Sequence, residues 1–167
     1  FLKFLKHKNQ SDIIFVGLYP MIDKAVMDKA VKLKYVAIPA NTIENIDEEY
    51  AKSKGIAVVS LWGEHEFLNT ITSTAELACG LMIDIARFTP WAFDTVKNYK
   101  WDRENFRGHT LHGKTLGIVG MGRLGTWMAR YGKAFGMDVI FYDPQVKESR
   151  VPDCRRVSFD ELLAQSD

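Results

Sequence analysis

The chain has 167 residues, of which 47% are hydrophobic and 26% charged, with a net charge of +1 at pH 7. This balance is typical of a globular protein, gives no basic excess for binding nucleic acid, and leaves no apolar stretch long enough to cross a membrane. The two cysteines, Cys79 and Cys154, lie far apart and lack metal-site spacing. We therefore expect free thiols in a reducing, cytoplasmic compartment and no metal.

The first 69 residues alternate between strand and helix patterns. The predicted strands span residues 12–18, 35–38 and 56–61, and the predicted helices span residues 1–8, 22–31 and 47–53. Asp47 is expected to cap the third helix, and Gly55 lies just beyond its end. Such alternation is typical of a parallel sheet covered by helices. We predict a first domain over residues 1–69 that ends in an irregular polar connection, Trp62–Asn69.

Two helices are predicted next, at the start of a second domain over residues 70–167. The first spans Ser73–Phe88 and is capped by Thr72 or Ser73, with Glu76 as the capping-box partner of Ser73. The second spans Trp91–Tyr99, and a polar loop follows it. A short capped helix over residues 158–164 ends the chain.

The most informative segment begins with the apolar run Thr115–Val119, which predicts a buried strand of a parallel sheet. A GxGxxG turn over residues 120–125 follows, and a second strand, Val139–Tyr142, ends at Asp143. Between them an apolar helical stripe is formed by Leu124, Trp127, Met128, Tyr131 and Phe135. This order of strand, glycine turn, helix, strand and acid is the fingerprint of a dinucleotide-binding βαβ unit.

Each element of the fingerprint has a physical role. Gly120 suits the sharp turn, Gly122 lets a pyrophosphate approach the backbone, and Gly125 lets the helix pack closely on the strand. The helix start attracts an anion. Asp143 would accept hydrogen bonds from ribose hydroxyls and repel a 2′-phosphate, which favours NAD over NADP. The alternatives are that the unit binds FAD or another adenosine-containing ligand, or that the glycine turn binds nothing.

Four stretches carry a family resemblance. They are residues 45–47 with 55–59, residues 73–87, residues 101–115, and residues 117–144. Together they resemble the D-isomer-specific 2-hydroxyacid dehydrogenases, especially the phosphoglycerate dehydrogenase branch. The resemblance implies an α/β protein: a partial flavodoxin-like substrate domain over residues 1–69, and the first half of a Rossmann-type, doubly wound NAD domain over residues 70–167. We therefore expect a fragment of a longer enzyme, truncated at both ends.

The resemblance also implies a function. The intact protein would oxidise the CH–OH group of a small D-2-hydroxy acid with NAD, or reduce the 2-keto acid, and would form a homodimer. The family's catalytic arginine, glutamate and histidine lie later in the NAD domain, so no catalytic residue is assigned and the chain alone is expected to be inactive. The alternatives are a non-catalytic, corepressor-like NAD sensor of the same fold and a dinucleotide-binding fragment without activity.

Some family contacts match residues of this chain. Arg123 and Leu124 match positions whose backbone faces the pyrophosphate, and Thr74 matches a position that touches the cofactor in some relatives. Asn41 and Thr42 match a turn that holds the substrate carboxylate through backbone N–H groups. The sequence departs from the family there, because Pro39–Glu44 lacks the glycines that relatives show. This departure leaves the identity of the 2-hydroxy acid open.

Overall fold

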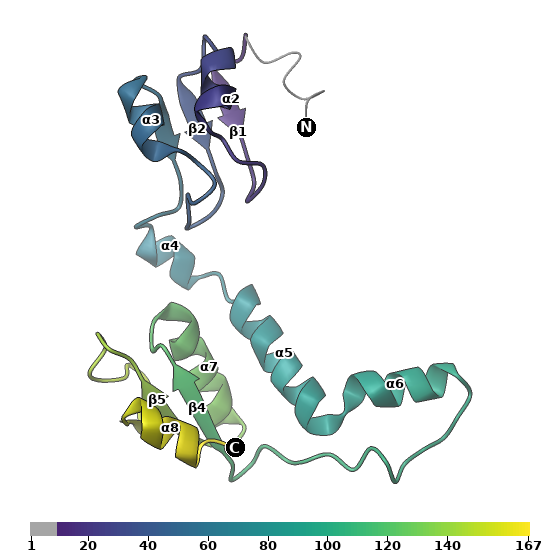
Figure 1. Ribbon diagram of the computed structural model, residues 1–167. Helices are drawn as coiled ribbons and strands as arrows, with labels where there is room; N and C mark the ends of the chain where they lie inside the picture. Colours follow the sequence, from purple (N-terminus) through teal and green to yellow (C-terminus); the bar gives the residue numbers. More distant parts are fainter. Residues whose placement is uncertain (1–9) are drawn as a thin grey trace. The chain divides into compact units, whose positions relative to one another are not determined.

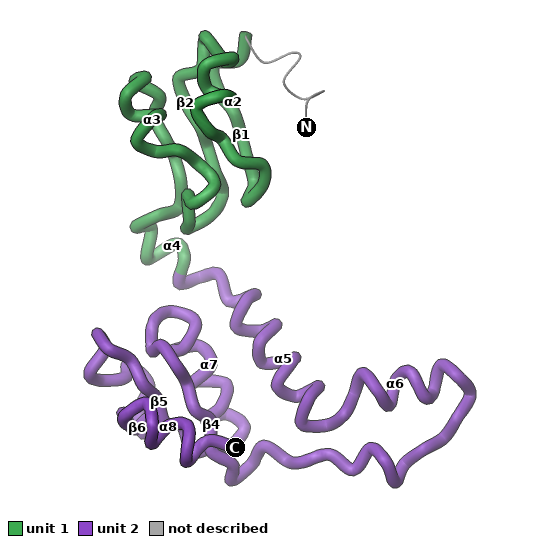
Figure 2. Tube along the Cα trace, viewed as in Figure 1, with its two compact units in different colours: residues 1–68 green, residues 69–167 purple. Residues whose placement is uncertain are grey.

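The structure is a computed structural model that describes residues 10–167, and the chain forms two compact units, Phe1–Leu68 and Asn69–Asp167 (Figures 1 and 2). The helix predicted for residues 1–8 lies outside the described residues. Each unit is built on a three-stranded parallel sheet that packs against helices. The predicted α/β class is therefore confirmed.

Unit 1 has its strands in sequence order. Its elements are β1 (Ile13–Phe15), α2 (Lys24–Lys29), β2 (Tyr35–Ala37), α3 (Glu48–Ser53), β3 (Ala57–Val59) and α4 (His65–Asn69). The strands and helices predicted here are confirmed in position, although each strand is shorter than predicted. The prediction of an irregular connection before residue 70 is wrong, because α4 forms within it.

The core of unit 1 follows from alternation along the strands. Ile14 and Val36 point into the core, where they pack with Met27 of α2 and Ala51 of α3. The helices begin at aspartates whose side chains accept hydrogen bonds from the first turn: Asp23 caps α2, and Asp47 caps α3 as predicted.

Unit 2 begins with two helices and continues with a second parallel sheet. Its elements are α5 (Ser73–Arg87), α6 (Thr89–Lys97), β4 (Thr115–Val119), α7 (Arg123–Ala134), β5 (Asp138–Tyr142), β6 (Cys154–Arg156) and α8 (Phe159–Gln165). The strand order is β4-β5-β6. β6 was not predicted, because its sequence Cys-Arg-Arg has no apolar alternation.

The central strand β5 is covered on both faces. Val139 and Phe141 pack into one cluster with Ala129 of α7, whereas Ile140 packs on the other side with Leu162 of α8. The two helices therefore lie on opposite sides of the sheet (Figure 1). This is the doubly wound arrangement, in which a strand buried on both faces is apolar throughout.

The face of α7 that meets the sheet is made of small residues. Ala129 and Gly132 are its buried positions, and a Cβ at Gly132 would lie 2.6 Å from the Leu116 side chain. The predicted stripe from Leu124 to Phe135 is mostly half-buried and flanks this face. Helix α7 therefore lies where the apolar stripe predicts a helix, but glycine and alanine rather than large side chains determine its distance from the sheet.

The start of α5 differs from the prediction. Its N-cap is Thr72, no side chain caps the helix, and the Thr72 hydroxyl bonds to Glu76, so the capping box predicted for Ser73 is wrong. The capping box of α8, between Ser158 and Glu161, is present. No helix in the described part of the chain is both long and apolar enough to pass through a membrane.

Candidate functional site

The turn between β4 and α7 is fixed by backbone geometry. Gly120 has a φ of +92°, in the left-handed region that favours glycine. Its N–H donates to the Tyr142 carbonyl at 2.8 Å, directly after the pairing of Val119 with Tyr142. The chain therefore turns at the carboxyl end of β4, beside the end of β5.

The other two glycines of the turn differ in what surrounds them. A Cβ at Gly125 would lie 2.0 Å from the Gly120 carbonyl oxygen, so the fold itself demands glycine there. A Cβ at Gly122 would meet no atom within 4 Å, and the φ of −73° there is one that any residue adopts. The fold therefore explains Gly120 and Gly125 but not Gly122, which borders open space.

The helix that starts at this turn has no side-chain cap. Gly122 is the N-cap of α7, and its carbonyl accepts from both the N–H and the hydroxyl of Thr126, at 2.9 and 2.7 Å. A helix leaves its first amides without partners inside the helix, and these carry its partial positive charge. The amides of the first turn, including those of Leu124 and Gly125, are placed to hold an anion over Gly122.

Asp143 is buried beside the turn, with 8% of its surface exposed. Its carboxylate accepts from the backbone N–H groups of Met121, Gln145 and Val146 at 2.7–2.8 Å. These bonds lower the pKa of Asp143 below its ordinary value, with the bond from Val146 contributing most. The carboxylate is thus anionic at neutral pH and held against the glycine turn.

The Arg123 side chain connects the turn to the start of α5. Its guanidinium donates to the Ile71 carbonyl at 2.6 Å, two residues before α5 begins. Thr74 lies exposed in the first turn of α5. The bond thus ties the α7 N-terminus to Ile71, three residues before Thr74, through the Arg123 side chain, whereas the sequence assigned a role only to the Arg123 backbone. No sequence signal identified the bond to Ile71.

Asn41 and Thr42 lie in unit 1, in the loop that follows β2 at the carboxyl end of its sheet. The neighbouring Ala40 carbonyl accepts from the Leu61 N–H at 2.9 Å, which ties this loop to the one after β3. Ligands of open α/β sheets bind outside the carboxyl ends of the strands, so both residues lie where a ligand of this unit would lie.

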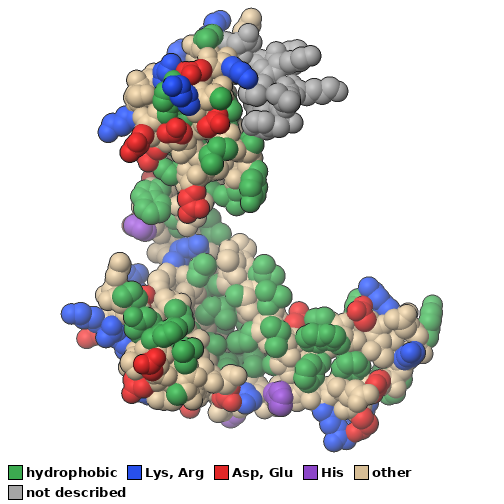
Figure 3. All heavy atoms as spheres, in the orientation of Figure 1, with side chains coloured by type: hydrophobic (Ala, Val, Ile, Leu, Met, Phe, Trp, Pro, Cys, Tyr) green, Lys and Arg blue, Asp and Glu red, His purple; other side chains and the backbone are tan. Residues whose placement is uncertain are grey.

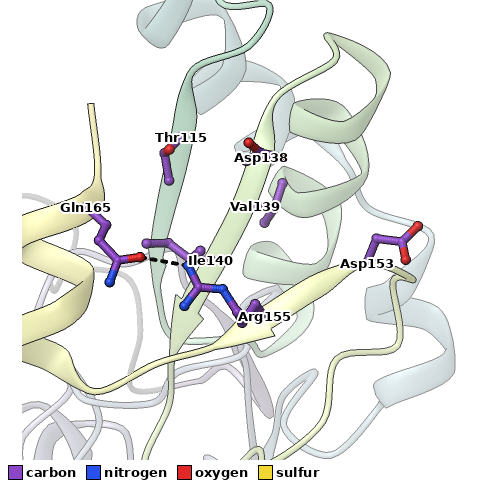
Figure 4. A pocket seen from close by; sticks show the side chains of 7 residues that line it. All are labelled: Thr115, Asp138, Val139, Ile140, Asp153, Arg155 and Gln165. Carbon is purple, nitrogen blue, oxygen red and sulfur yellow. Dashed lines mark hydrogen bonds between the residues drawn. The ribbon is translucent and has the colours of Figure 1, made fainter.

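Unit 2 also has a cavity of about 260 Å³ that is distinct from the glycine turn (Figure 4). Thr115 and Asp138, the first residues of β4 and β5, line it, and so does Arg155, which bonds to Gln165. The cavity therefore lies toward the amino ends of the strands, whereas the glycine turn lies at their carboxyl ends. No group of three metal-ligating side chains occurs within residues 10–167.

The residues at the turn fit a dinucleotide. The space over Gly122 admits a pyrophosphate, the uncapped first turn of α7 supplies amide donors, and Asp143 supplies a fixed anionic acceptor for ribose hydroxyls. The first two features suit the pyrophosphate of any dinucleotide, and an acid at the end of the second strand is the feature that would favour NAD over NADP.

Comparison with known proteins gives the same result. Residues 79–167 match the family described as "D-isomer specific 2-hydroxyacid dehydrogenase, NAD binding domain". The chain belongs to the D-isomer-specific 2-hydroxyacid dehydrogenase family. The cofactor of this family's domain is NAD, and the predicted Rossmann-type fold is confirmed.

Individual members of the family are similar over most of this chain. It is 39% identical to a D-3-phosphoglycerate dehydrogenase of Methanocaldococcus jannaschii over 85% of this chain, and 35% identical to a hydroxypyruvate reductase of Thermotoga maritima over 93%. It spans 26% and 49% of those two relatives.

A solved structure of a family member is also similar. D-lactate dehydrogenase of Aquifex aeolicus, solved with NAD and lactic acid, has a TM-score of 0.78 and 29% identity over 98% of this chain and 48% of its own. The similarity thus covers both units.

Proposed function

We propose that the full-length protein is an NAD-dependent oxidoreductase that interconverts a D-2-hydroxy acid and the corresponding 2-oxo acid. Family membership supports the reaction class. The observation that carries the proposal is Gly122, a glycine that no contact within residues 10–167 requires and that borders the uncapped end of α7.

The proposed cofactor contacts all come from unit 2. Gly120 and Gly125 shape the turn, Gly122 leaves the backbone open, and the amides at Arg123 and Leu124 hold the pyrophosphate. Asp143 binds the adenosine ribose, and Thr74 contacts the cofactor from α5. In this assignment residues 70–167 are the first half of the NAD domain.

The proposed substrate contacts come from the first domain, residues 1–69. Backbone N–H groups at Asn41 and Thr42 hold the substrate carboxylate. NAD supplies the hydride acceptor when it is bound, and NADH the donor. This chain's share of catalysis is therefore positioning: unit 2 orients the dinucleotide, and the loop after β2 orients the acid.

The substitution Gly122→Val tests the cofactor site. Since a Cβ there meets nothing, the variant should fold and keep its melting temperature within a few degrees, while the dissociation constant for NAD rises by about tenfold or more. Gly80→Val is the matched control, because Gly80 of α5 is also exposed with nothing within 4 Å. Calorimetric titration with NAD measures both. Unchanged affinity in Gly122→Val would refute the assignment.

A stopped assay of the full-length protein with NAD and a panel of small 2-hydroxy acids tests the reaction. NADH formation from at least one acid is expected. A protein that binds NAD and oxidises none of them is an NAD sensor and not a dehydrogenase.

We also propose a homodimer formed through α5 and α6. Six large apolar side chains are more than half exposed on these helices: Leu77, Leu81, Ile85, Trp91, Phe93 and Val96. Hydrophobic side chains are visible along both helices in Figure 3. A patch of this kind favours a protein interface. Leu81→Glu should lower the molar mass of the full-length protein, measured by analytical ultracentrifugation, to that of a monomer.

We also propose a cytoplasmic location, which the free thiols of Cys79 and Cys154 favour.

A further inference from the structure

The loops at the carboxyl end of the unit 1 sheet are joined into one surface. We define the carboxyl edge of unit 1 as residues 16–23, 38–47 and 60–67, which follow β1, β2 and β3. The Asn45 side-chain amide donates to the carbonyls of Gly17 and Pro20 at 3.0 and 3.1 Å. The Leu61 N–H donates to Ala40. These bonds hold all three loops in fixed relation to one another.

The side chains that this edge exposes are large and apolar. Tyr19 is 89% exposed and Trp62 is 74% exposed, and Leu18, Met21 and Phe67 are each more than half exposed. Hydrophobic side chains are visible at this end of unit 1 in Figure 3. They lie in the loops after β1 and β3, whereas Asn41 and Thr42, the proposed carboxylate contacts, lie in the loop after the middle strand β2.

Lysine and arginine are absent from the same surface. Within the three segments of the carboxyl edge the acidic residues are Asp23, Glu44, Asp47, Glu64 and Glu66, and His65 is the side chain that can carry a positive charge. Three lysines of unit 1 are engaged elsewhere: Lys34 pairs with Asp12, Lys54 pairs with Asp28, and Lys24 lies over the Tyr50 ring. Exposed apolar side chains such as Phe15 and Val31 occur in other parts of the unit, but Tyr19 and Trp62 lie at the end of the sheet whose loops contain no lysine or arginine.

Backbone amides suffice for one carboxylate, but a second anionic group on the substrate needs a charged partner when it leaves water. A phosphate held against this edge would meet Tyr19, Trp62 and several carboxylates, and it would find no lysine or arginine there, with His65 as the one side chain that could carry a positive charge. An apolar side chain would bury its surface against the same rings and gain free energy.

We propose that the carboxyl edge of unit 1 selects 2-oxo acids with an uncharged apolar or aromatic side chain over phosphorylated ones, with Tyr19 and Trp62 as specificity-determining residues. This inference rests on the proposed function. It distinguishes the protein from its relative named D-3-phosphoglycerate dehydrogenase, although the two chains are 39% identical.

The test compares kcat/KM of the full-length protein with NADH for three substrates: 4-methyl-2-oxopentanoate, phenylpyruvate and 3-phosphonooxypyruvate. At least one apolar acid should exceed the phosphorylated acid by about tenfold or more. Equal or higher kcat/KM for 3-phosphonooxypyruvate would overturn the inference and leave the proposed function standing. If the protein reduces none of these three acids and no other 2-oxo acid, both the inference and the proposed function are overturned.

Two variants locate the effect. Tyr19→Arg and Trp62→Arg add a cation to the edge, and each should shift the kcat/KM ratio toward the phosphorylated acid by about tenfold. Tyr35→Arg is the matched control, because Tyr35 is an exposed aromatic residue at the amino end of β2. If Tyr19→Arg and Trp62→Arg change the oligomeric state or melting temperature but not the ratio, the edge is covered by protein and the inference is wrong.

Discussion

The two units have parallel sheets with the same sequential strand order, and they differ at the turn that follows the first strand of each sheet. In unit 2 the chain passes from β4 into α7 through Gly-Met-Gly, and α7 has no side-chain cap. In unit 1 the chain passes from β1 into α2 through Gly-Leu-Tyr-Pro, and the Asp23 carboxylate caps α2 through the Val26 N–H at 2.9 Å. The sheets have the same strand order, so the turn after the first strand is a local difference between the two units that bears on which groups each can bind.

The comparison shows what an anion site requires. An acidic cap satisfies helix amides with a charge of the protein's own and repels any further anion. An uncapped helix behind a glycine leaves the same amides for a ligand. Unit 2 therefore suits a pyrophosphate, and unit 1 leaves its carboxyl edge to apolar side chains and backbone amides.

The largest expected effect comes from giving α7 the cap that α2 has. Gly122→Asp should retain the fold and change the stability by only a few tenths of a kcal/mol, because glycine and aspartate are both accepted N-caps. The dissociation constant for NAD should rise by about 100-fold, which is ~2.7 kcal/mol, because the carboxylate occupies the anion position. Calorimetric titration measures it. Retained NAD affinity would mean that the amides of α7 do not hold the pyrophosphate.

A second prediction separates the packing role of Gly125 from the binding role of Gly122. Gly125→Ala should lower the free energy of unfolding by about 2 kcal/mol, since its Cβ would lie 2.0 Å from the Gly120 oxygen. Gly80→Ala, in open space on α5, should instead raise it by about 0.5–1 kcal/mol, because alanine is the better helix former. Urea denaturation measures both. Equal effects at the two glycines would contradict the close packing of α7 on its own turn.

A third prediction concerns the acid at the end of β5. Asp143→Ala should weaken NAD binding and relax discrimination against NADP by about tenfold, since both the ribose acceptor and the charge that repels a 2′-phosphate are lost. Parallel titrations with NAD and NADP give the ratio. If both affinities stay unchanged, Asp143 serves only to tie the turn to β5.

Asp143 also makes the turn sensitive to acid. Its pKa in the folded protein lies below the ordinary value of 3.8, because three backbone N–H groups bond to the carboxylate. The unfolded chain therefore takes up the proton first, so the stabilisation is present above pH 3.8 and is lost as pH falls through the lower, native pKa. The stability difference between the wild type and Asp143→Ala should be constant from pH 7 to about 5 and shrink below 3.8. A difference that grows in acid would contradict the lowered pKa.

Sequence patterns could predict the parts of the molecule that local chemistry determines. The strand and helix around the fingerprint and the caps Asp47 and Ser158 follow from local propensity. Non-local contacts determine the rest. β6 exists because β5 pairs with it, and α4 forms in a polar stretch that lacks a periodic pattern. The Arg123 bond to Ile71 spans 52 positions, and no spacing rule predicts it.

The smallest expected effect tests the acidic cap in unit 1. Asp23→Ala should destabilise unit 1 by about 1 kcal/mol, because the Val26 N–H loses its acceptor, while Asp23→Ser should restore most of that loss without the charge. Urea denaturation of the full-length protein measures this loss of stability.

Titration with inorganic pyrophosphate tests whether α2 binds an anion once its acidic cap is removed. We expect no binding to unit 1 in either variant, because α2 has six residues and its preceding turn carries Leu18 and Tyr19 side chains in place of bare glycine backbone. If inorganic pyrophosphate bound to the double variant Asp23→Ala/Gly122→Asp, removing a cap would be sufficient to create an anion site. The glycines of unit 2 would then matter less for binding the anion than for the packing of α7.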